Sequence, residues 1–224
     1  MSLTFSYTQK GEYTLPEPGT YNARCVRVID LGTQQTTFQG QVKTPKQVMI
    51  QWELFGDEGA EEKPFIISER YNCNPGTALH PKGKLRPMLA SWRGRDFTPE
   101  EEAAFDAYNL LGKDCMVSII HSTGEKTYAN VASVAPPMKG MLTKLKGFQA
   151  TTDLLYFDLS KAGQIGFQTD YGSLPEWIQN IIHKSKEWPD VMRKMHGGTA
   201  PQAQPATDGM AVELDDEELA AMPF

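Results

Sequence analysis

The sequence predicts a mainly β fold: a five-stranded barrel with a helical insertion between its third and fourth strands, a C-terminal helix and a disordered acidic tail. Short segments rich in β-branched and aromatic residues recur up to residue 136, as is typical of strands. Residues 82–112 interrupt them with apolar side chains at helical spacing. Residues 197–224 are rich in Gly, Pro, Ala and carboxylates, a composition that cannot bury enough apolar surface to fold.

Three strands are expected in the first part of the chain. Residues 19–31 follow Pro-rich turn signals and are rich in β-formers, and residues 64–72 have the same character. The segment 32–46 is polar and carries two Gly and a Pro, which indicates a long hairpin loop. Residues 47–55 alternate, so one face of this strand carries the apolar side chains of Val48, Ile50, Trp52 and Leu54.

The insertion predicts two helices. Apolar residues at i, i+3, i+4 and i+7 indicate a helix that begins around 83–86, and they are Leu85, Met88, Leu89 and Trp92. A Thr-Pro-Glu-Glu capping box at 98–101 indicates a second helix that runs to about Leu111 and stops at Gly112. Residues 114–121 and 126–135 then predict two more strands.

Three strands, a helical insertion and two further strands suit the oligonucleotide/oligosaccharide-binding (OB) fold. A Ser-Leu-Pro-Glu sequence at 173–176 resembles another capping box and indicates an amphipathic helix over 173–186, which frays at Trp188-Pro189. We therefore expect an OB-fold domain, a C-terminal extension, and a flexible linker with an acidic tail, at 1–136, 137–196 and 197–224.

The net charge of −6 belongs to the tail. Six of the 28 acidic residues lie from 208 onward, where there is no Lys or Arg, so residues 1–207 hold 22 acidic and 22 basic residues. Within this neutral body the positive charge is clustered: residues 82–95 and 139–146 contain basic residues and no acid. Clustered positive charge predicts a track for a nucleic-acid backbone.

The sequence offers no signature of an enzyme. Six residues separate Gly76 from Gly83 before Lys84, whereas a phosphate-binding P-loop needs four. The four His show no metal-ligand spacing, and no acids are set among apolar strands as a two-metal nuclease requires. We expect a protein that is not an enzyme and has no cofactor and no metal.

The cellular compartment is predicted from the spacing of the cysteines and from the lack of a long apolar run and of a signal peptide. Three widely spaced cysteines indicate reduced thiols of a cytosolic protein. The chain has no run of about 18 apolar residues and no signal peptide. We expect a cytoplasmic protein without a membrane partner, or one in the host-cell cytoplasm if it is phage-encoded.

The end of the chain has the form of a tethered ligand. A Gly/Pro/Ala/Gln-rich tether precedes four carboxylates, and the chain ends in Met-Pro-Phe. It resembles the C-terminal tail of bacterial and phage single-stranded DNA-binding proteins, which recruits replication and repair proteins. One departure is the Leu-Ala-Ala-Met segment between the acids and Pro-Phe, and a purely solubilising terminus is the alternative. The residues expected to bind partners are Asp215, Asp216, Glu217, Glu218, Met222, Pro223 and Phe224.

Three internal blocks carry a second resemblance. They are LASWRGRDFT at 89–98, KTYANVA at 126–132 and LPEWI at 174–178. These blocks resemble a family of tailed-phage proteins that are encoded near replication genes and are thought to be OB-fold single-stranded DNA-binding proteins. The resemblance spans roughly residues 17–190. It implies a protein that coats single-stranded DNA without sequence preference during phage replication, recombination or repair.

Binding to single strands needs cations for phosphates and aromatic faces for bases. Tyr128 shares a strand face with Lys126 and Asn130, and Phe38 lies in the polar loop; packing in the interior is the alternative for both rings. Arg93 and Arg95 flank Gly94 after a helix and are expected to point outward onto phosphates, with capping of that helix as the alternative. The full set of candidate contacts is Phe38, Lys43, Lys46, Arg70, Tyr71, Lys84, Arg86, Arg93, Arg95, Lys126 and Tyr128.

Two other functions remain open on the sequence alone. One is a protein-interaction adaptor that does not bind DNA and whose tail only solubilises it. The other is an OB-fold accessory of a nuclease or helicase. A homo-oligomer is compatible with each.

Overall fold

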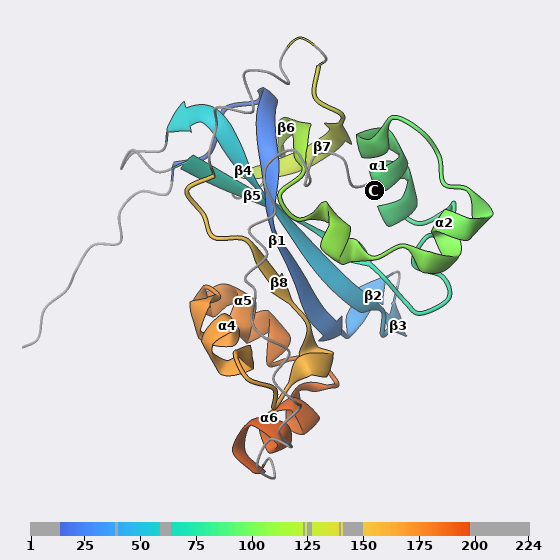
Figure 1. The fold of residues 1–224 in the computed structure, drawn as a ribbon, viewed down its shortest axis with the longest axis vertical. Coiled ribbons are helices and arrows are strands. Elements are labelled where there is room, and N and C mark those ends of the chain that lie inside the picture. Colours follow the sequence, from blue (N-terminus) through green and yellow to red (C-terminus); the bar gives the residue numbers. More distant parts are fainter. Residues whose placement is uncertain are drawn as a thin grey trace, which may run out of the picture.

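Strand β1 (Gly19–Thr33) is the strand around which the sheet is built (Figure 1). In this computed structural model, residues 14–38, 40–58, 64–122, 124, 127–138, 140 and 150–197 are described. The first part of β1 pairs with β6 (Asp114–Ser122), its later part pairs with β4 (Lys46–Glu58), and both pairings are antiparallel. Beyond the part of β1 that pairs with β6, β8 (Leu155–Phe157) pairs with β1 in parallel.

The complete sheet has six strands in the order β5-β4-β1-β6-β7, with β8 beside β1. Its outer strands are β5 (Pro64–Asn72) and β7 (Tyr128–Ala135), and the sheet is not closed by hydrogen bonds between them. The sequence predicted five strands and left residues 150–171 open between a short helix and a strand, because the three residues of β8 are too few to show a period. The expected loop 32–46 contains a separate hairpin of β2 (Thr36–Phe38) and β3 (Gln41–Lys43).

The main core lies on the inner face of the sheet. The alternation of apolar and polar residues along β4 predicted which face this is. Ile50, Trp52 and Leu54 are buried there, and Trp52 meets Trp92 edge-on with ring centroids 6.0 Å apart. Trp92 belongs to helix α1 (Leu85–Arg93), which begins within the predicted window and turns its apolar stripe to the sheet. The insertion is therefore fastened to the sheet by aromatic packing.

The second predicted helix is shorter than expected. The capping box is present: Thr98 accepts a hydrogen bond from Glu101, and the Glu101 side chain accepts one from the Thr98 backbone. However, α2 covers only Pro99–Ala104, because Phe105 is extended and a 3-10 turn, η1 (Ala107–Leu110), follows. The Asp106 carboxylate accepts from the Tyr108 N–H and starts that turn.

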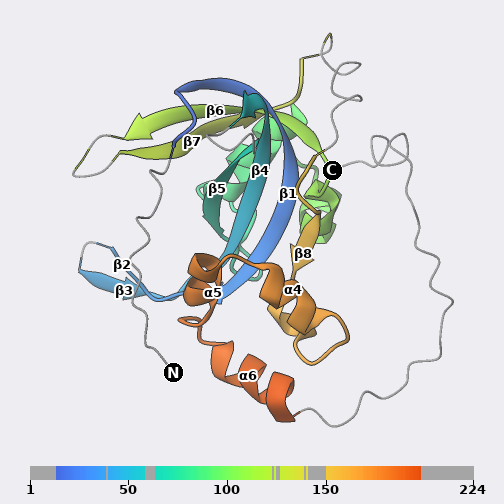
Figure 2. The ribbon, with the colours of Figure 1, turned by 90° about the vertical axis from the view of Figure 1, so that its left-hand side faces the viewer.

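A second core covers the outer face of β1 and β4 (Figure 2). It contains Ile29, Leu31 and Met49 from the strands and apolar side chains from the C-terminal elements. These elements are η2 (Leu159–Lys161), α4 (Phe167–Ser173), α5 (Glu176–Ile182) and α6 (Trp188–Gly197). A buried carboxylate fixes their approach, because Glu53 accepts hydrogen bonds of 2.8 Å from the Thr151 and Thr152 N–H groups.

Two expectations for this region are wrong. Ser173 does not cap a following helix; it ends α4, its hydroxyl donates to the Asp170 carbonyl, and α5 begins without a side-chain cap after Pro175. Trp188-Pro189 does not mark a frayed end but opens α6, where Pro occupies the first turn without losing a hydrogen bond. The expected helix 173–186 is therefore replaced by a seven-residue helix with helices on both sides.

The C-terminal elements also hold the root of the β2–β3 hairpin. Glu187 accepts from the Thr33 N–H at 2.7 Å and from its hydroxyl at 2.6 Å. This close approach needs a glycine at 32, since a Cβ there would lie 2.7 Å from the Glu187 carboxylate and φ is +71°.

Among the helices that the structure describes, none is long and apolar enough to cross a bilayer.

Candidate nucleic-acid interface

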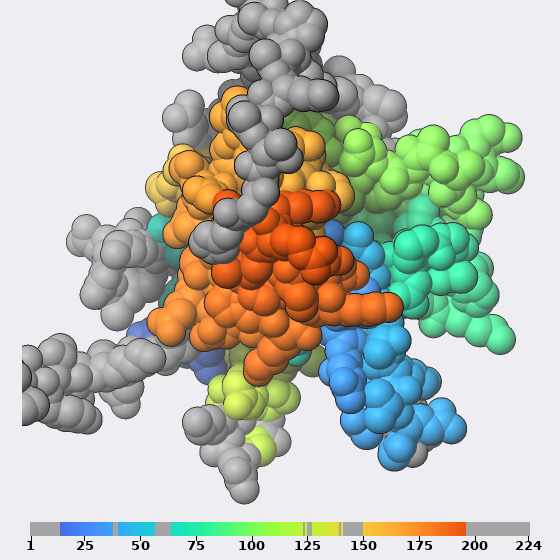
Figure 3. Space-filling model, turned by 90° about the horizontal axis from the view of Figure 1, so that it is seen from below, coloured from blue at the N-terminus to red at the C-terminus, as the bar shows by residue number. Residues whose placement is uncertain are grey.

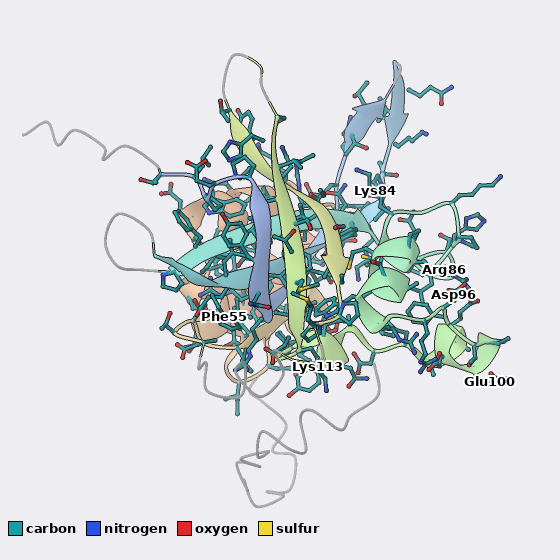
Figure 4. The ribbon with its side chains drawn as sticks, turned by 90° about the horizontal axis from the view of Figure 1, so that it is seen from above. Phe55, Lys84, Arg86, Asp96, Glu100 and Lys113 are labelled. Atoms are coloured by element: carbon teal, nitrogen blue, oxygen red, sulfur yellow. The ribbon has the colours of Figure 1, made fainter. Side chains whose placement is uncertain are left out.

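The basic cluster of the insertion turns inward onto acidic side chains. Arg86 points toward Asp96 (Figure 4), with its Nε 3.2 Å from that carboxylate, and it also pairs with Glu102. Arg95 is half exposed, yet its guanidinium donates two hydrogen bonds to Glu101. Arg86 is therefore engaged inside the insertion, whereas Arg95 is exposed as expected but paired with Glu101.

Arg93 is the clearest correction. Its side chain is only 2% exposed, Nη2 lies 2.6 Å from Glu101, and the guanidinium lies 4.2 Å from the centre of the Phe97 ring. A buried, paired cation under an aromatic ring acts as a packing element. The expected outward projection fails because Glu101, which the capping box places in the first turn of α2, faces the end of α1.

Two other aromatic candidates differ from expectation or lie outside what is described. Tyr71 is 4% exposed and belongs to the main core, because it pairs with Val48 on the inner side of the sheet. Burial raises the pKa of its hydroxyl. Phe38 lies in β2, but its side chain, like the whole of Lys126, is outside the described residues.

The remaining cations lie around one end of the sheet. Lys43 on β3, Arg70 near the end of β5 and Lys84 before α1 are all exposed. In the described part of the chain, no ion pair engages Arg70 or Lys84. Lys46 is different, because its ammonium lies 3.1 Å from the Asp30 carboxylate.

The Lys46–Asp30 pair is partly buried. Burial lowers the pKa of Lys46, but the neighbouring Asp30 outweighs this and raises it above its usual value. Burial raises the pKa of Asp30. Lys46 therefore has its own counter-ion and is a weaker phosphate candidate than the exposed cations.

Tyr128 fulfils the geometric expectation for a stacking platform. It is the first residue of β7 and is 58% exposed. Its neighbour Asn130 donates to the Ser122 hydroxyl at 2.9 Å and to the Tyr128 carbonyl at 3.1 Å, which fixes the backbone below the ring. Ile120, opposite Asn130 on β6, is 53% exposed and extends this face.

The β2–β3 and β6–β7 hairpins project on the same side of the molecule, with β5 and β4 between them (Figure 2). Seen from below, the β2–β3 hairpin stands out beside the C-terminal helices (Figure 3). The arrangement brings Lys43 on one arm and Tyr128 on the other to one side of the sheet.

Sequence reasoning missed two lysines near this side. Lys184 and Lys186 are exposed in the turn after α5, and the Lys186 N–H donates to the Thr33 carbonyl at the hairpin root. Their proximity to the hairpin depends on packing across more than 150 residues of chain, as the Thr33–Glu187 bond shows. The only signal in the sequence is the pair of Lys that follows the apolar stripe of the helix.

No family model matches this chain, and no curated protein matches it.

Within the described ranges, no group of three or more His, Cys, Asp or Glu has a metal-binding arrangement. The three cysteines are free thiols: Cys25 and Cys115 are buried and Cys73 is half-buried. The tail residues that are expected to bind partners, within 215–224, lie outside the described residues.

Proposed function

We propose that this protein is a single-stranded DNA-binding protein that coats strands without sequence preference during DNA replication, recombination or repair, with phage DNA as the expected setting. The observation that carries the proposal is the exposed Tyr128 ring on a hairpin that shares its side of the molecule with the cation-bearing β2–β3 hairpin. Aromatic stacking and a cationic flank are the two interactions that bind single strands irrespective of sequence.

The strand arrangement supports an OB-type barrel. The order β5-β4-β1-β6-β7 brings the outer strands β5 and β7 near each other, although no ladder of hydrogen bonds joins them. In OB folds, oligonucleotides bind across the second and third strands between two loops. Here the corresponding strands are β4 and β5, and the corresponding loops are the β2–β3 and β6–β7 hairpins.

The decisive experiment is a fluorescence titration of the full chain with oligo-dT. Tyr128→Ala should weaken binding by about 1–3 kcal/mol, or about 5- to 150-fold, with little change in thermal stability. Tyr108→Ala is the matched control, because Tyr108 is 54% exposed but packs edge-on against Tyr156 in the region of the insertion. Equal loss in both variants, or no binding by the wild type, would sink the proposal; the latter would favour a protein-binding adaptor.

Salt dependence tests the cationic part of the site. With Arg86, Arg93 and Arg95 already paired, three or four phosphate contacts by the remaining cations give a log–log salt slope of about −2 to −3. Lys84→Ala should flatten that slope, whereas Arg95→Ala should leave it close to the wild-type value. A wild-type slope near zero would contradict a phosphate track.

The C-terminal tail completes the proposal as a recruiting segment for replication and repair proteins. Deleting 208–224 should raise affinity for DNA at low salt, because six tethered carboxylates compete with phosphates at millimolar effective concentration. Removing Phe224 alone should preserve DNA affinity but abolish capture of a partner that reads the terminal ring and carboxylate. Capture that survives loss of Phe224 would leave the tail a solubilising segment.

A further inference from the structure

A cavity of about 780 Å³ lies where the sheet, the insertion and the C-terminal extension meet. Strands β1 and β4 supply one wall, the loop 73–84 with α1 and α2 supplies the second, and the end of β8 supplies the third. Pockets for small ligands span about 300–1,000 Å³, so this volume accommodates a nucleotide. The DNA-contact proposal above does not use this cavity.

Two of its walls are apolar. Half-buried Val48 faces it from β4, and half-buried Leu79 and Phe105 face it from the loop and from the end of α2. Apolar walls on two sides suit a planar ring system, because the two faces of such a ring make few hydrogen bonds with water and lose little when they are buried. Tyr156 also lines the cavity, and burial, with a smaller effect of Asp158, raises the pKa of its hydroxyl to about 12. The phenol hydroxyl is able to donate and to accept hydrogen bonds.

The charged groups of the cavity do not favour an anion inside it. Lys46 is paired with Asp30, and Arg86 is paired with Glu102 and Asp96. Asp158 adds a third carboxylate to the lining, where one of its oxygens accepts from the Ser160 N–H. The interior thus holds acceptors and counter-ion pairs, which suits a neutral ligand that brings its own N–H donors.

The positive charge lies outside, on the loop that forms one wall. Lys82 and Lys84 are exposed there, next to the lining residues Pro81 and Leu85. In the described part of the chain, neither lysine has an ion-pair partner. A ligand with an aromatic, donor-bearing head and an anionic end matches this division between interior and rim.

We infer that the cavity binds a nucleotide unit, with the base between the apolar walls and the phosphate outside at Lys82 and Lys84. Exocyclic amino groups of the base supply the donors that the acceptors of the lining require, and the ring supplies the flat apolar body. The unit comes either from a free nucleotide or from one residue of a bound strand, and the second source rests on the proposed function.

Two neighbouring alanines give a matched test. Ala103 and Ala104 are both exposed on α2, but only Ala103 lines the cavity. With the full chain and deoxyadenosine monophosphate as probe in equilibrium dialysis, Ala103→Trp should lower affinity at least tenfold and Ala104→Trp should leave it unchanged. Equal effects of the two variants, or no binding by the wild type, would overturn the inference.

The rim is tested with the same probe and its nucleoside. The double variant Lys82→Ala with Lys84→Ala should weaken binding of the monophosphate but not of deoxyadenosine, since only the former reaches the rim cations. This variant changes exposed side chains alone, so it does not depend on how the cavity tolerates a new ring. Equal weakening of both probes, or of neither, would contradict the placement of the phosphate.

Competition with oligo-dA, whose bases carry the exocyclic amino group, separates the two sources and the two proposals. Displacement of the monophosphate by oligo-dA, together with weaker oligo-dA binding by Ala103→Trp, supports occupancy by a strand residue. Simultaneous binding without displacement supports a free nucleotide. Binding of oligo-dT with no binding of the monophosphate overturns the cavity inference and leaves the proposed function standing; the reverse result supports the cavity and removes the proposed function.

Discussion

The helical insertion and the β6–β7 hairpin use their side chains in opposite ways. In the insertion, Arg86, Arg93 and Arg95 turn back onto carboxylates that lie within about fifteen residues of chain, so much of its positive charge is neutralised internally. On the hairpin, the Asn130 side chain donates a hydrogen bond to the Tyr128 carbonyl, and the Tyr128 ring is left 58% exposed. The difference shows that a basic segment is not a basic surface, and that an exposed ring on a fixed strand is the better indicator of a binding face.

Among the substitutions that test this difference, truncating a buried aromatic residue of the insertion should change the free energy of unfolding the most. Trp92→Ala removes a ring that is 1% exposed and packs on Trp52, so it should lower the free energy of unfolding by about 3–5 kcal/mol. Urea denaturation measures this loss. Affinity for oligo-dT, corrected for the folded fraction, should not change; a specific loss of affinity would place the insertion in the binding site.

Removing a buried cation should cost less than removing that ring. Arg93→Ala removes a guanidinium that is only 2% exposed and packs against Phe97, and it leaves Glu101 with Arg95 as its remaining partner, so it should lower the free energy of unfolding. The control is Arg95→Ala, whose side chain is 52% exposed and should therefore lower it much less. Equal stability losses would mean that the burial of Arg93 does not matter.

The smallest effect should appear in the pH dependence of the same cluster. Hydrogen bonds from Arg95, with the Thr98 N–H next, lower the pKa of Glu101 to about 2 from an ordinary 4.5. A lowered carboxyl pKa stabilises the folded state above the unfolded pKa, and this contribution fades as the pH falls from about 4.5 toward 2. Glu101→Gln should therefore lower the urea midpoint at pH 7, and the difference from wild type should disappear near pH 2.

The opposite outcome is informative. If the Glu101→Gln difference in urea midpoint is the same at pH 7 and pH 2.5, the side chain contributes through its shape and its neutral hydrogen bonds. The charge-paired description of the insertion would then be wrong. The wild-type protein measured at each pH in parallel supplies the reference.

Local patterns in the sequence were sufficient for the elements whose physics is local. The alternation around Trp52 predicted which face of β4 is buried, and the capping box at Thr98 and Glu101 predicted where α2 begins. Spacing also predicted that Trp92 faces the core and that Tyr128 faces away from it. Each of these depends on residues within one turn of helix or one strand, where side-chain period and hydrogen bonding decide the outcome.

Only the tertiary structure decided the roles that depend on distant partners. Arg93 became a packing element because α2 folds back against the end of α1, and Tyr71 became a core residue because β5 pairs with β4 in the register that places it opposite Val48. Ser173 lost its expected cap because α4 continues to that residue, and the β8 pairing follows from the C-terminal elements packing on β1. A sequence records which charges and rings a chain carries, but long-range packing chooses which of them neutralise one another and which remain available to a ligand.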